Sequence, residues 1–182
     1  MKTQLSGFNN DWYNPGPKHK RVIWYLVNEL FIKNTLNPSS GLRIVLLRLF
    51  GARIGNGVII KPGVNVKYPW KLSIGNHCWI GENVWIDNLD YVEIKNNVCV
   101  SQGALLLCGN HNYKLPSFDL IIKPITLEEG CWIGAKSIVA PGVKIGEQAV
   151  LSLNSVASND LEPNFIYRGN PALKIKKRYV SA

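Results

Sequence analysis

The hydrophobic positions of this chain follow a six-residue rhythm. From Ile54 onward an aliphatic residue returns about every six positions and is often followed by glycine. The clearest pairs are Ile54-Gly55, Ile74-Gly75, Ile80-Gly81, Ile133-Gly134 and Ile145-Gly146. This period fits neither one face of an α-helix nor the strict alternation of an ordinary strand. Hexapeptide repeats are typical of a parallel β-helix, in which every six residues form one side of a coil. The pattern therefore predicts an all-β fold, a parallel β-helix.

The repeat also predicts which side chains fill the core and which turn the corners. The aliphatic residue should point inward and stack on its equivalent one coil away, at about 4.7–4.9 Å. The residue four places on is small or slender, which suits a cramped corner. We expect Gly55-Asn56 and Gly75-Asn76 to turn corners with left-handed backbone angles, which glycine and asparagine adopt at low cost.

The phase of the rhythm divides the chain. With two-residue slips it runs from Ile54 until it breaks at Asn110, and it resumes at Leu127. We therefore expect the β-helix to span residues 54–166, with an excursion loop at residues 110–126. Long loops in compact domains are usually functional or disordered, and the His, Tyr, Phe and Asp residues of this one favour a functional loop.

The N-terminal residues 1–53 lack the rhythm. Residues 1–18 predict an extended arm, and residues 20–33 and 41–50 predict two apolar helices. Neither segment reaches the roughly 20 apolar residues that a bilayer span needs. We expect the arm and a helical cap over the open end of the β-helix, because repeat folds require capped ends. A basic amphipathic helix can also lie on a membrane surface, and the two hypotheses are compatible.

Composition favours a single domain in a reducing compartment. The chain has 182 residues, a net charge of +9 and four cysteines, and this length is sufficient for a sizeable core. The cysteines lack zinc-ligand spacing, and Cys78 and Cys131 are expected to be core thiols. The sequence shows no apolar signal segment with a small-residue cleavage site. We therefore expect a reduced, cytoplasmic protein.

Several features carry a family resemblance. These are the hexapeptide repeats, the loop with its histidine, the coil Trp132-Ile133-Gly134-Ala135 and the closing segment Gly169-Asn170-Pro171-Ala172. Over residues 54–178 the chain resembles the maltose, galactoside and nodulation-type O-acetyltransferases, which are hexapeptide-repeat proteins with a left-handed parallel β-helix. The opening SGFNNDWYNPG and the loop NHNYKLPSFDL resemble still more closely the colanic-acid-biosynthesis acetyltransferase branch. The resemblance implies an acetyl-CoA-dependent O-acetyltransferase that works as a homotrimer with active sites between subunits.

His111 is the residue expected to act as the general base. A sugar hydroxyl must lose a proton as it attacks a thioester, and one histidine, which titrates near neutrality, is sufficient. Positioning and backbone N–H groups can supply the rest. His111 opens the loop, whereas His77 is expected at a surface corner and His19 in the solvated arm. The alternatives are a solvated loop histidine and a Cys108–His111 nucleophile pair.

Outward side chains near the loop are candidate acceptor ligands. Asp87 follows the inward Ile86, so it is expected to point outward on the face that carries the loop, where it could bind a sugar hydroxyl or orient the histidine. Trp85 and Asn88 are substrate-binding candidates beside it. Asp119 in the loop is a candidate orienting carboxylate. The alternative for each is an outward side chain on a solvated face.

The cofactor side is placed by the resemblance alone. In the family the pantetheine arm of CoA lies along the coils that follow the histidine loop. The matching positions are Trp132, Ala135, Ala140, Ser152, Ser158 and Asn159. In the basic C-terminal tail, residues 167–182, Lys174 and Lys177 match positions that face the CoA phosphates. Asn159 stands where relatives have a basic residue, which puts one phosphate contact in doubt. Corner packing and a solvated basic tail are the alternatives.

Other functions fit the sequence less well. Zinc carbonic anhydrases of this fold need three His ligands, whereas only His77 and His111 lie in the β-helix, so no metal is expected. The basic residues are scattered outside the tail, which argues against nucleic-acid binding. A catalytically idle scaffold is a further alternative. Among acceptors we expect a lipid-linked exopolysaccharide precursor first, with peripheral membrane contact. A free sugar, an antibiotic of the chloramphenicol or streptogramin type, or serine remain alternatives, as does a longer acyl donor.

Overall fold

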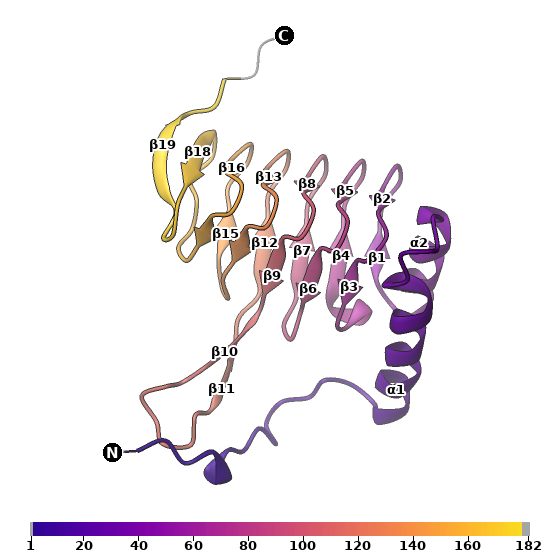
Figure 1. The fold of residues 1–182 in the computed structure, drawn as a ribbon, viewed down its shortest axis with the longest axis vertical. Helices are drawn as coiled ribbons and strands as arrows, with labels where there is room; N and C mark the ends of the chain where they lie inside the picture. The colour runs from indigo at the N-terminus through magenta and orange to yellow at the C-terminus, as the bar shows by residue number, and fades with distance from the viewer. Residues whose placement is uncertain (1, 180–182) are drawn as a thin grey trace.

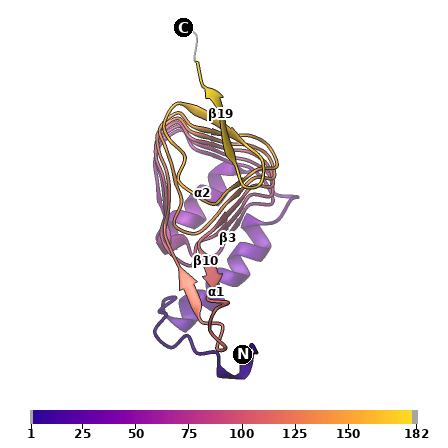
Figure 2. The same ribbon diagram turned by 90° about the vertical axis from the view of Figure 1, so that its left-hand side faces the viewer.

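The structure, a computed structural model, describes residues 2–179, and most of them form a prism of stacked coils. Figure 1 shows the coils side by side along one axis, with two helices at one end and a hairpin leaving the body. Each coil adds a short strand to each of three parallel sheets, so that the cross-section is triangular (Figure 2). The predicted left-handed parallel β-helix is confirmed by this architecture.

The three sheets, here called A, B and C, run the length of the prism. Sheet A contains β1 (Arg53–Ile54), β4 (Leu72–Ile74), β7 (Val92–Ile94), β12 (Ile125–Leu127) and β15 (Lys144–Ile145). Sheet B contains β2 (Ile59–Ile60), β5 (Trp79–Ile80), β8 (Cys99–Val100), β13 (Trp132–Ile133), β16 (Val150–Leu151), β18 (Phe165–Arg168) and β19 (Leu173–Lys177). Sheet C contains β3 (Asn65–Val66), β6 (Trp85–Asp87), β9 (Leu105–Leu107), β14 (Ile138–Val139) and β17 (Val156–Ala157). Two short 3-10 turns, η1 (Leu5–Gly7) and η3 (Pro69–Lys71), lie outside the sheets.

The inward side chains form continuous ladders, as the rhythm predicted. In sheet A, Ile54 pairs with Ile74, Ile74 with Ile94, Ile94 with Leu127 and Leu127 with Ile145. These side chains are buried. Because successive strand residues point to opposite faces, the intervening residues face out and become available for a site. The core therefore continues without interruption past the excursion loop.

The corners differ from the expectation at Gly55 and Gly75. The left-handed residues are Gly57 (φ 66°) and His77 (φ 56°), two positions later. Gly55 is needed for a different reason, since a Cβ built on it would lie 2.5 Å from Asn76 Oδ1 and 2.7 Å from the Gly75 carbonyl carbon. The glycines that follow the inward isoleucines thus allow close stacking of coils, and the backbone handedness is set elsewhere.

The excursion expected at residues 110–126 is a two-stranded hairpin. β10 (Gly109–His111) pairs antiparallel with β11 (Leu120–Ile122). The chain is already back in sheet A at β12, two residues before the predicted return at Leu127. Since β9 of sheet C precedes the hairpin and β12 of sheet A follows it, the hairpin leaves the prism at the edge between sheets C and A. Figure 1 shows it pointing away from the coils.

Two helices close the N-terminal end of the prism. α1 (Lys18–Val27) continues into the π-helical turn η2 (Asn28–Ile32), and α2 (Ser40–Leu49) follows after a short connection. Both correspond to helices predicted from the sequence. Within residues 2–179 no helix is both long enough and apolar enough to cross a bilayer. The helices contact strands of the first coil, as a cap does.

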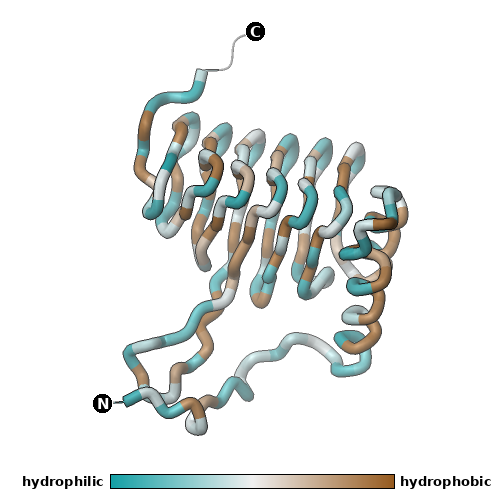
Figure 3. Tube along the Cα trace, in the orientation of Figure 1, coloured by the Kyte–Doolittle hydropathy of each residue, from teal (hydrophilic) through white to brown (hydrophobic). Residues whose placement is uncertain are grey.

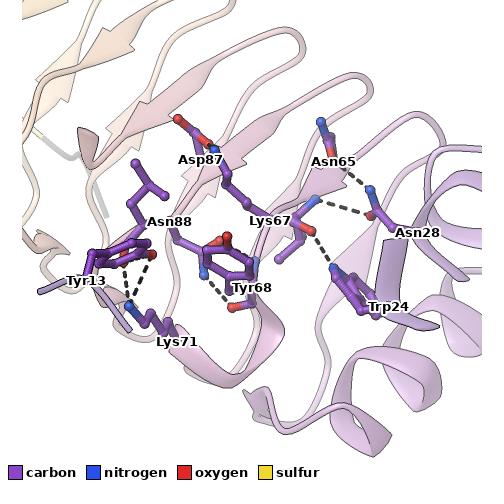
Figure 4. Close-up of polar contacts among 11 residues, drawn as sticks. Tyr13, Trp24, Asn28, Asn65, Lys67, Tyr68, Lys71, Asp87 and Asn88 are labelled. Carbon is purple, nitrogen blue, oxygen red and sulfur yellow. Dashed lines mark hydrogen bonds and ion pairs between the residues drawn. The ribbon is translucent and has the colours of Figure 1, made fainter. Parts of the chain in front are cut away.

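The inner faces of the cap are held by hydrogen bonds to the first coil. Trp24 Nε1 donates to the Val66 carbonyl at 2.8 Å, and Asn28 Nδ2 donates to Asn65 Oδ1 at 2.8 Å (Figure 4). These bonds use backbone and side-chain groups at the open end of sheet C. The orientation of α1 relative to the prism is therefore fixed.

A buried arginine joins the two helices of the cap. Arg43 is 0% exposed, and its guanidinium donates to the backbone carbonyls of Ile32, Asn34, Asn37 and Ser39. Buried charges are tolerated only when such partners satisfy them. Arg43 thus supplies hydrogen-bond donors to carbonyl groups in the connection between α1 and α2.

The N-terminal arm runs back outside the prism to the hairpin (Figure 1). Tyr13 Oη donates to the Leu89 carbonyl at 2.8 Å, and Lys71 Nζ reaches the same carbonyl at 2.6 Å (Figure 4). Burial raises the pKa of Tyr13 far above its ordinary value. Further along, the Gln4 amide donates to the Pro116 carbonyl at 2.7 Å. The arm therefore bridges the cap and the hairpin.

The C-terminal tail begins as part of sheet B. β18 stacks in parallel on β16, and β19 turns back antiparallel on β18. The strand that begins the tail thus crosses the predicted boundary at residue 166. Residues 180–182 lie outside the described residues. Lys174, Lys176 and Lys177 belong to β19, which forms the edge of sheet B at the C-terminal end of the prism (Figure 2).

Candidate active site

His111 stands at the end of β10 with one ring nitrogen committed. Its Nδ1 lies 2.8 Å from the Phe118 carbonyl oxygen. A carbonyl oxygen can only accept a hydrogen bond, so Nδ1 is protonated in this contact and the neutral ring has its lone pair on Nε2. The half-buried imidazole is therefore in the tautomer that a general base needs.

Aromatic rings fix the plane of this imidazole. Phe118 stacks on it with ring centroids 4.4 Å apart and an interplanar angle of 8°. Phe8 of the N-terminal arm approaches with a centroid distance of 5.7 Å. Phe118 has a φ of 54°, a strained value for a bulky residue, and such strain often accompanies a functional constraint. The hairpin and the arm together hold His111.

The group that orients His111 is a backbone carbonyl, and the acidic candidates do not fill that place. Asp119 is half-buried in the hairpin, and its backbone carbonyl accepts a hydrogen bond from the Asn112 amide at 2.8 Å. Asp87 forms an ion pair with Lys67 instead. A backbone carbonyl leaves no signature in a sequence, because every residue has one, so the sequence pattern could not single out Phe118.

The candidates on β6 have different surroundings. Trp85 is 45% exposed on the outer face of sheet C. Asp87 leaves the same sheet but is only 7% exposed, and its carboxylate pairs with Lys67 at 2.9 Å (Figure 4). Asn88 is fully buried, accepts from the Tyr68 amide at 2.9 Å and donates to the Tyr68 carbonyl at 2.6 Å.

The interpretation of Asn88 as a solvent-facing substrate ligand is therefore wrong. The two-residue slip in these coils leaves the Tyr68 backbone without a strand partner, and the Asn88 amide replaces that partner. The expectation for Asp87 is correct in direction only, because Lys67 covers the outward carboxylate. Asp87 remains close to the root of the hairpin, since it pairs in register with Leu107, the last residue of β9.

A groove of about 420 Å³ lies on the outer face of sheet B. Its lining includes Trp79, Cys99 and Ser101. Trp132 stands beside it and donates from Nε1 to Ser101 Oγ at 2.8 Å. Register places Cys99 between the two tryptophans, which are 61% and 46% exposed. Exposed tryptophans beside a groove favour ligand binding, because their flat faces lose little entropy on contact.

Sequence reasoning found only part of this groove. It selected Trp132 through the family resemblance and missed Trp79 and Ser101. A signal was available, since each tryptophan directly precedes an inward isoleucine, in Trp79-Ile80 and Trp132-Ile133. Both dipeptides also belong to the second hexapeptide of their coil, counted from Ile74 and from Leu127, and this position places both tryptophans on sheet B.

The cysteines separate into buried and accessible thiols. Cys78 and Cys131 are buried, as expected. Cys108 is 0% exposed, and burial raises its pKa to about 12. Since the thiolate is the nucleophile, Cys108 does not fit a Cys–His pair with His111. Cys99 alone of the four is partly exposed, in the groove of sheet B.

We expect iodoacetamide to alkylate the native protein at Cys99, because this thiol borders the groove. Burial raises the pKa of Cys99 above its ordinary value, so the labelling rate should rise steeply between about pH 7 and about pH 9 as the thiolate forms. Mass spectrometry of tryptic peptides measures the site. Cys99→Ser should remove the label. Faster labelling of Cys108 would contradict the burial described above.

The positions matched to the cofactor lie on two edges of the prism. Ala135 and Ser152 follow strands of sheet B, at the edge between sheets B and C. Ala140, Ser158 and Asn159 follow strands of sheet C, at the same edge as the hairpin. One chain therefore does not bring all of these residues into one cleft. Within residues 2–179 no three His, Cys, Asp or Glu side chains converge in the manner of a metal site.

The two candidate phosphate-binding lysines of the tail have different surroundings. Lys174 Nζ forms an ion pair with Glu162 at 2.5 Å and lies 4.2 Å from the centroid of the Phe165 ring. Lys177 is exposed on β19. Lys177 is therefore more available than Lys174 to bind a phosphate group.

Known proteins share this fold and these sequence features. A family model described as the hexapeptide repeat of succinyl-transferase matches residues 124–156. The chain is 35% identical over 175 residues to WcaF of Escherichia coli (strain K12), a protein assigned to colanic acid biosynthesis as an acetyltransferase, and the match covers 96% of both chains. It is 27% identical over 135 residues to the galactoside O-acetyltransferase of the same organism, over 72% of this chain and 66% of that protein.

A solved structure has a similar fold. The hexapeptide-repeat acetyltransferase VCA0836 from Vibrio cholerae O1 biovar eltor, solved in complex with acetyl-CoA, superposes with a TM-score of 0.82 at 22% identity, over 97% of this chain and 96% of that chain. The similarity to WcaF spans nearly the whole length, including the arm, the histidine hairpin and the tail. The chain therefore belongs to the hexapeptide-repeat acetyltransferase family and is an acyltransferase.

Proposed function

We propose that this chain transfers the acetyl group of acetyl-CoA to a sugar hydroxyl during the biosynthesis of an exopolysaccharide. The assignment of WcaF to colanic acid biosynthesis supports the substrate class. The observation that carries the proposal is the 2.8 Å contact between His111 Nδ1 and the Phe118 carbonyl. It leaves Nε2 as a proton acceptor on a hairpin that projects from the body of the protein.

The site is proposed to form between copies of the chain. The hairpin with His111 leaves the triangular prism (Figure 2) at the edge between sheets C and A. Trp132 and its groove lie on sheet B, the side opposite that edge. A single chain cannot join them, because the hairpin points away from its own coils. A neighbour rotated about an axis parallel to the prism can supply the missing face. Three copies close such a ring, so we infer a homotrimer with three equal sites.

In this proposal the site is a cleft between two copies of the chain, and each of its two walls has a defined role. The hairpin edge provides His111, with Trp85 and Asp87 near its root as proposed acceptor contacts and Asp119 in the hairpin itself. The neighbour's sheet B provides Trp132 and the groove beside it. The acceptor hydroxyl is held between these two walls, within reach of Nε2. Asn88 is omitted from the proposal because it is buried.

The pantetheine arm of CoA is proposed to run along the coils that follow the hairpin. Small side chains at both edges allow a narrow chain to approach the backbone amides. They are Ala140, Ser158 and Asn159 on one edge and Ala135 and Ser152 on the other. Lys177 is the proposed phosphate contact, and Lys174 joins it only by exchanging Glu162 for the ligand.

The chemistry needs one base and an organised cleft. The acceptor hydroxyl gives its proton to His111 Nε2 while its oxygen attacks the carbonyl carbon of the thioester. A C–O bond forms, and backbone N–H groups stabilise the charge that develops on the carbonyl oxygen. The C–S bond then breaks, and the imidazolium returns the proton to the departing sulfur. The products are a sugar acetate and CoA, and no covalent enzyme intermediate is required.

A lipid-linked sugar is the proposed acceptor within this class, with the protein in peripheral contact with a membrane. The supporting observations are the exposed aliphatic side chains of the cap and the positive charge of the chain. Anionic membrane surfaces attract such charge. A free sugar or an antibiotic hydroxyl is the competing acceptor.

The proposal is tested by calorimetric titration of acetyl-CoA, followed by thiol release with a panel of acceptors. The panel contains free sugars, sugars linked to a short lipid and chloramphenicol. Thiol release with sugars, together with an acetyl ester in the product, supports the proposal. Release with chloramphenicol alone would transfer the activity to antibiotics. Failure to bind acetyl-CoA would leave an idle scaffold.

A further inference from the structure

The outer face of α1 is apolar, where a surface helix normally presents polar residues. Trp24 and Asn28 face the first coil. About one turn apart on the opposite side, Val22, Leu26 and Leu30 are 53%, 53% and 60% exposed. Neither the core nor the proposed active site uses these three side chains. Their exposure therefore calls for a separate explanation.

The second helix of the cap continues this surface. Leu42, Val45 and Leu49 of α2 are 40%, 59% and 76% exposed, on the side opposite Arg43 and Leu47. Both helices lie across the end of the prism (Figure 1), and Figure 3 shows their hydrophobic segments at that end. We call this surface the cap face. It consists of Val22, Ile23, Leu26, Leu30, Leu36, Leu42, Val45 and Leu49.

Basic residues are frequent in the segment that carries the cap face. Residues 18–53 contain seven Lys and Arg and one acidic residue, Glu29, so 7 − 1 gives +6 of the total charge of +9. Arg43 is buried and does not contribute to the surface. Lys18 and Arg53 are exposed, and Lys33 forms an ion pair with Glu29. The apolar surface is thus combined with an excess of positive charge.

We propose that the cap face docks on an anionic lipid bilayer. Aliphatic side chains enter the interface, while the basic residues contact lipid phosphates. A second copy of this chain fits this surface less well, because two caps of equal positive charge would repel each other. In a ring whose axis parallels the prism, the cap faces of all copies lie at one end and contact the membrane together, which strengthens weak single contacts.

This inference deepens the proposed function, because it names the surface through which the protein contacts a membrane that carries a lipid-linked sugar. It rests on that function only for the identity of the acceptor. The membrane contact itself follows from the cap and is measured without acetyl-CoA. Failure of one proposal is therefore distinguishable from failure of the other.

The test is co-sedimentation of the full-length protein with vesicles of phosphatidylglycerol and phosphatidylcholine, or of phosphatidylcholine alone. We expect binding to the anionic vesicles that weakens as salt is raised, because salt screens the charge. The double variant Leu26→Ser, Leu30→Ser should reduce binding about tenfold. Leu153→Ser is the matched control, since Leu153 is 72% exposed in the β-helix, away from the cap, and it should bind as the original chain does.

A second variant guards against misfolding of the first. Lys18→Glu combined with Arg53→Glu leaves the apolar residues in place and should also reduce binding to anionic vesicles. Thermal unfolding and transfer to a water-soluble sugar acceptor confirm that each variant folds. Absence of binding by the original chain overturns the proposal. So does an assembly larger than the trimer in light scattering that the Leu26→Ser, Leu30→Ser change removes, because the cap face would then bind another copy.

Discussion

Replacement of His111 by alanine is expected to lower turnover by about two to four orders of magnitude, as the loss of a general base does. Binding of acetyl-CoA should change little, because the imidazole contacts Phe118 and Phe8 in the hairpin and the arm. Thiol release measures the turnover, and calorimetric titration measures the affinity. A loss confined to turnover would assign His111 to the chemical step.

The matched control is His77→Asn. His77 is exposed at a corner with a φ of 56°, a backbone conformation that asparagine accepts more readily than most residues. Its activity should stay near that of the original chain. If His111→Ala retained similar activity, His111 would have no part in the reaction, and the tautomer fixed by Phe118 would have only structural importance.

Two inactive variants should restore activity when they are assembled together. His111→Ala removes the base from the hairpin, and Trp132→Ala removes a wall of the groove on sheet B. In a ring each site takes its hairpin from one copy and its groove from the next. With random mixing of equal amounts, half of the hairpins and half of the grooves are intact, so about a quarter of the sites should work. Unfolding and refolding the two variants together, followed by thiol release, measures the recovery.

Controls separate this result from a site within one chain. Each variant refolded alone should stay at its own low activity. The double variant has neither an intact hairpin nor an intact groove, so mixing it with the original chain should give no activity beyond that of the original chain present. Recovery near zero in the mixed sample would mean that hairpin and groove of the same chain work together. Light scattering on the same samples reports whether three copies associate.

The β-helix could be predicted because its sequence pattern is direct. Each inward residue, from Ile54 to Leu151, repeats a local requirement for an aliphatic side chain, and equivalent positions meet whenever coils stack. The close approach of the next coil at Gly55 could not be predicted from the local pattern alone. The backbone of the next coil creates the constraint, so the sequence indicated a special residue and misplaced the left-handed turn by two positions.

The candidate site was predictable in its chemistry and less so in its partners. His111 was identifiable because it opens the segment in which the rhythm breaks. Phe118 was not, because it acts through a carbonyl that every residue has. Asn88 was misjudged because its burial depends on unpaired backbone groups at Tyr68, twenty residues earlier in the chain. Trp79 was missed although its phase equals that of Trp132.

The sequence by itself determined the coil, the inward ladder, the cap helices and the histidine, because each follows from local periodicity or from residue type. Only the tertiary structure decided what lies beside what. It put the arm against the hairpin, selected the acceptor for His111 Nδ1, and separated His111 from the groove at Trp132 by the width of the prism. Those relations depend on contacts between segments remote in the chain, and such contacts form only when the whole prism is built.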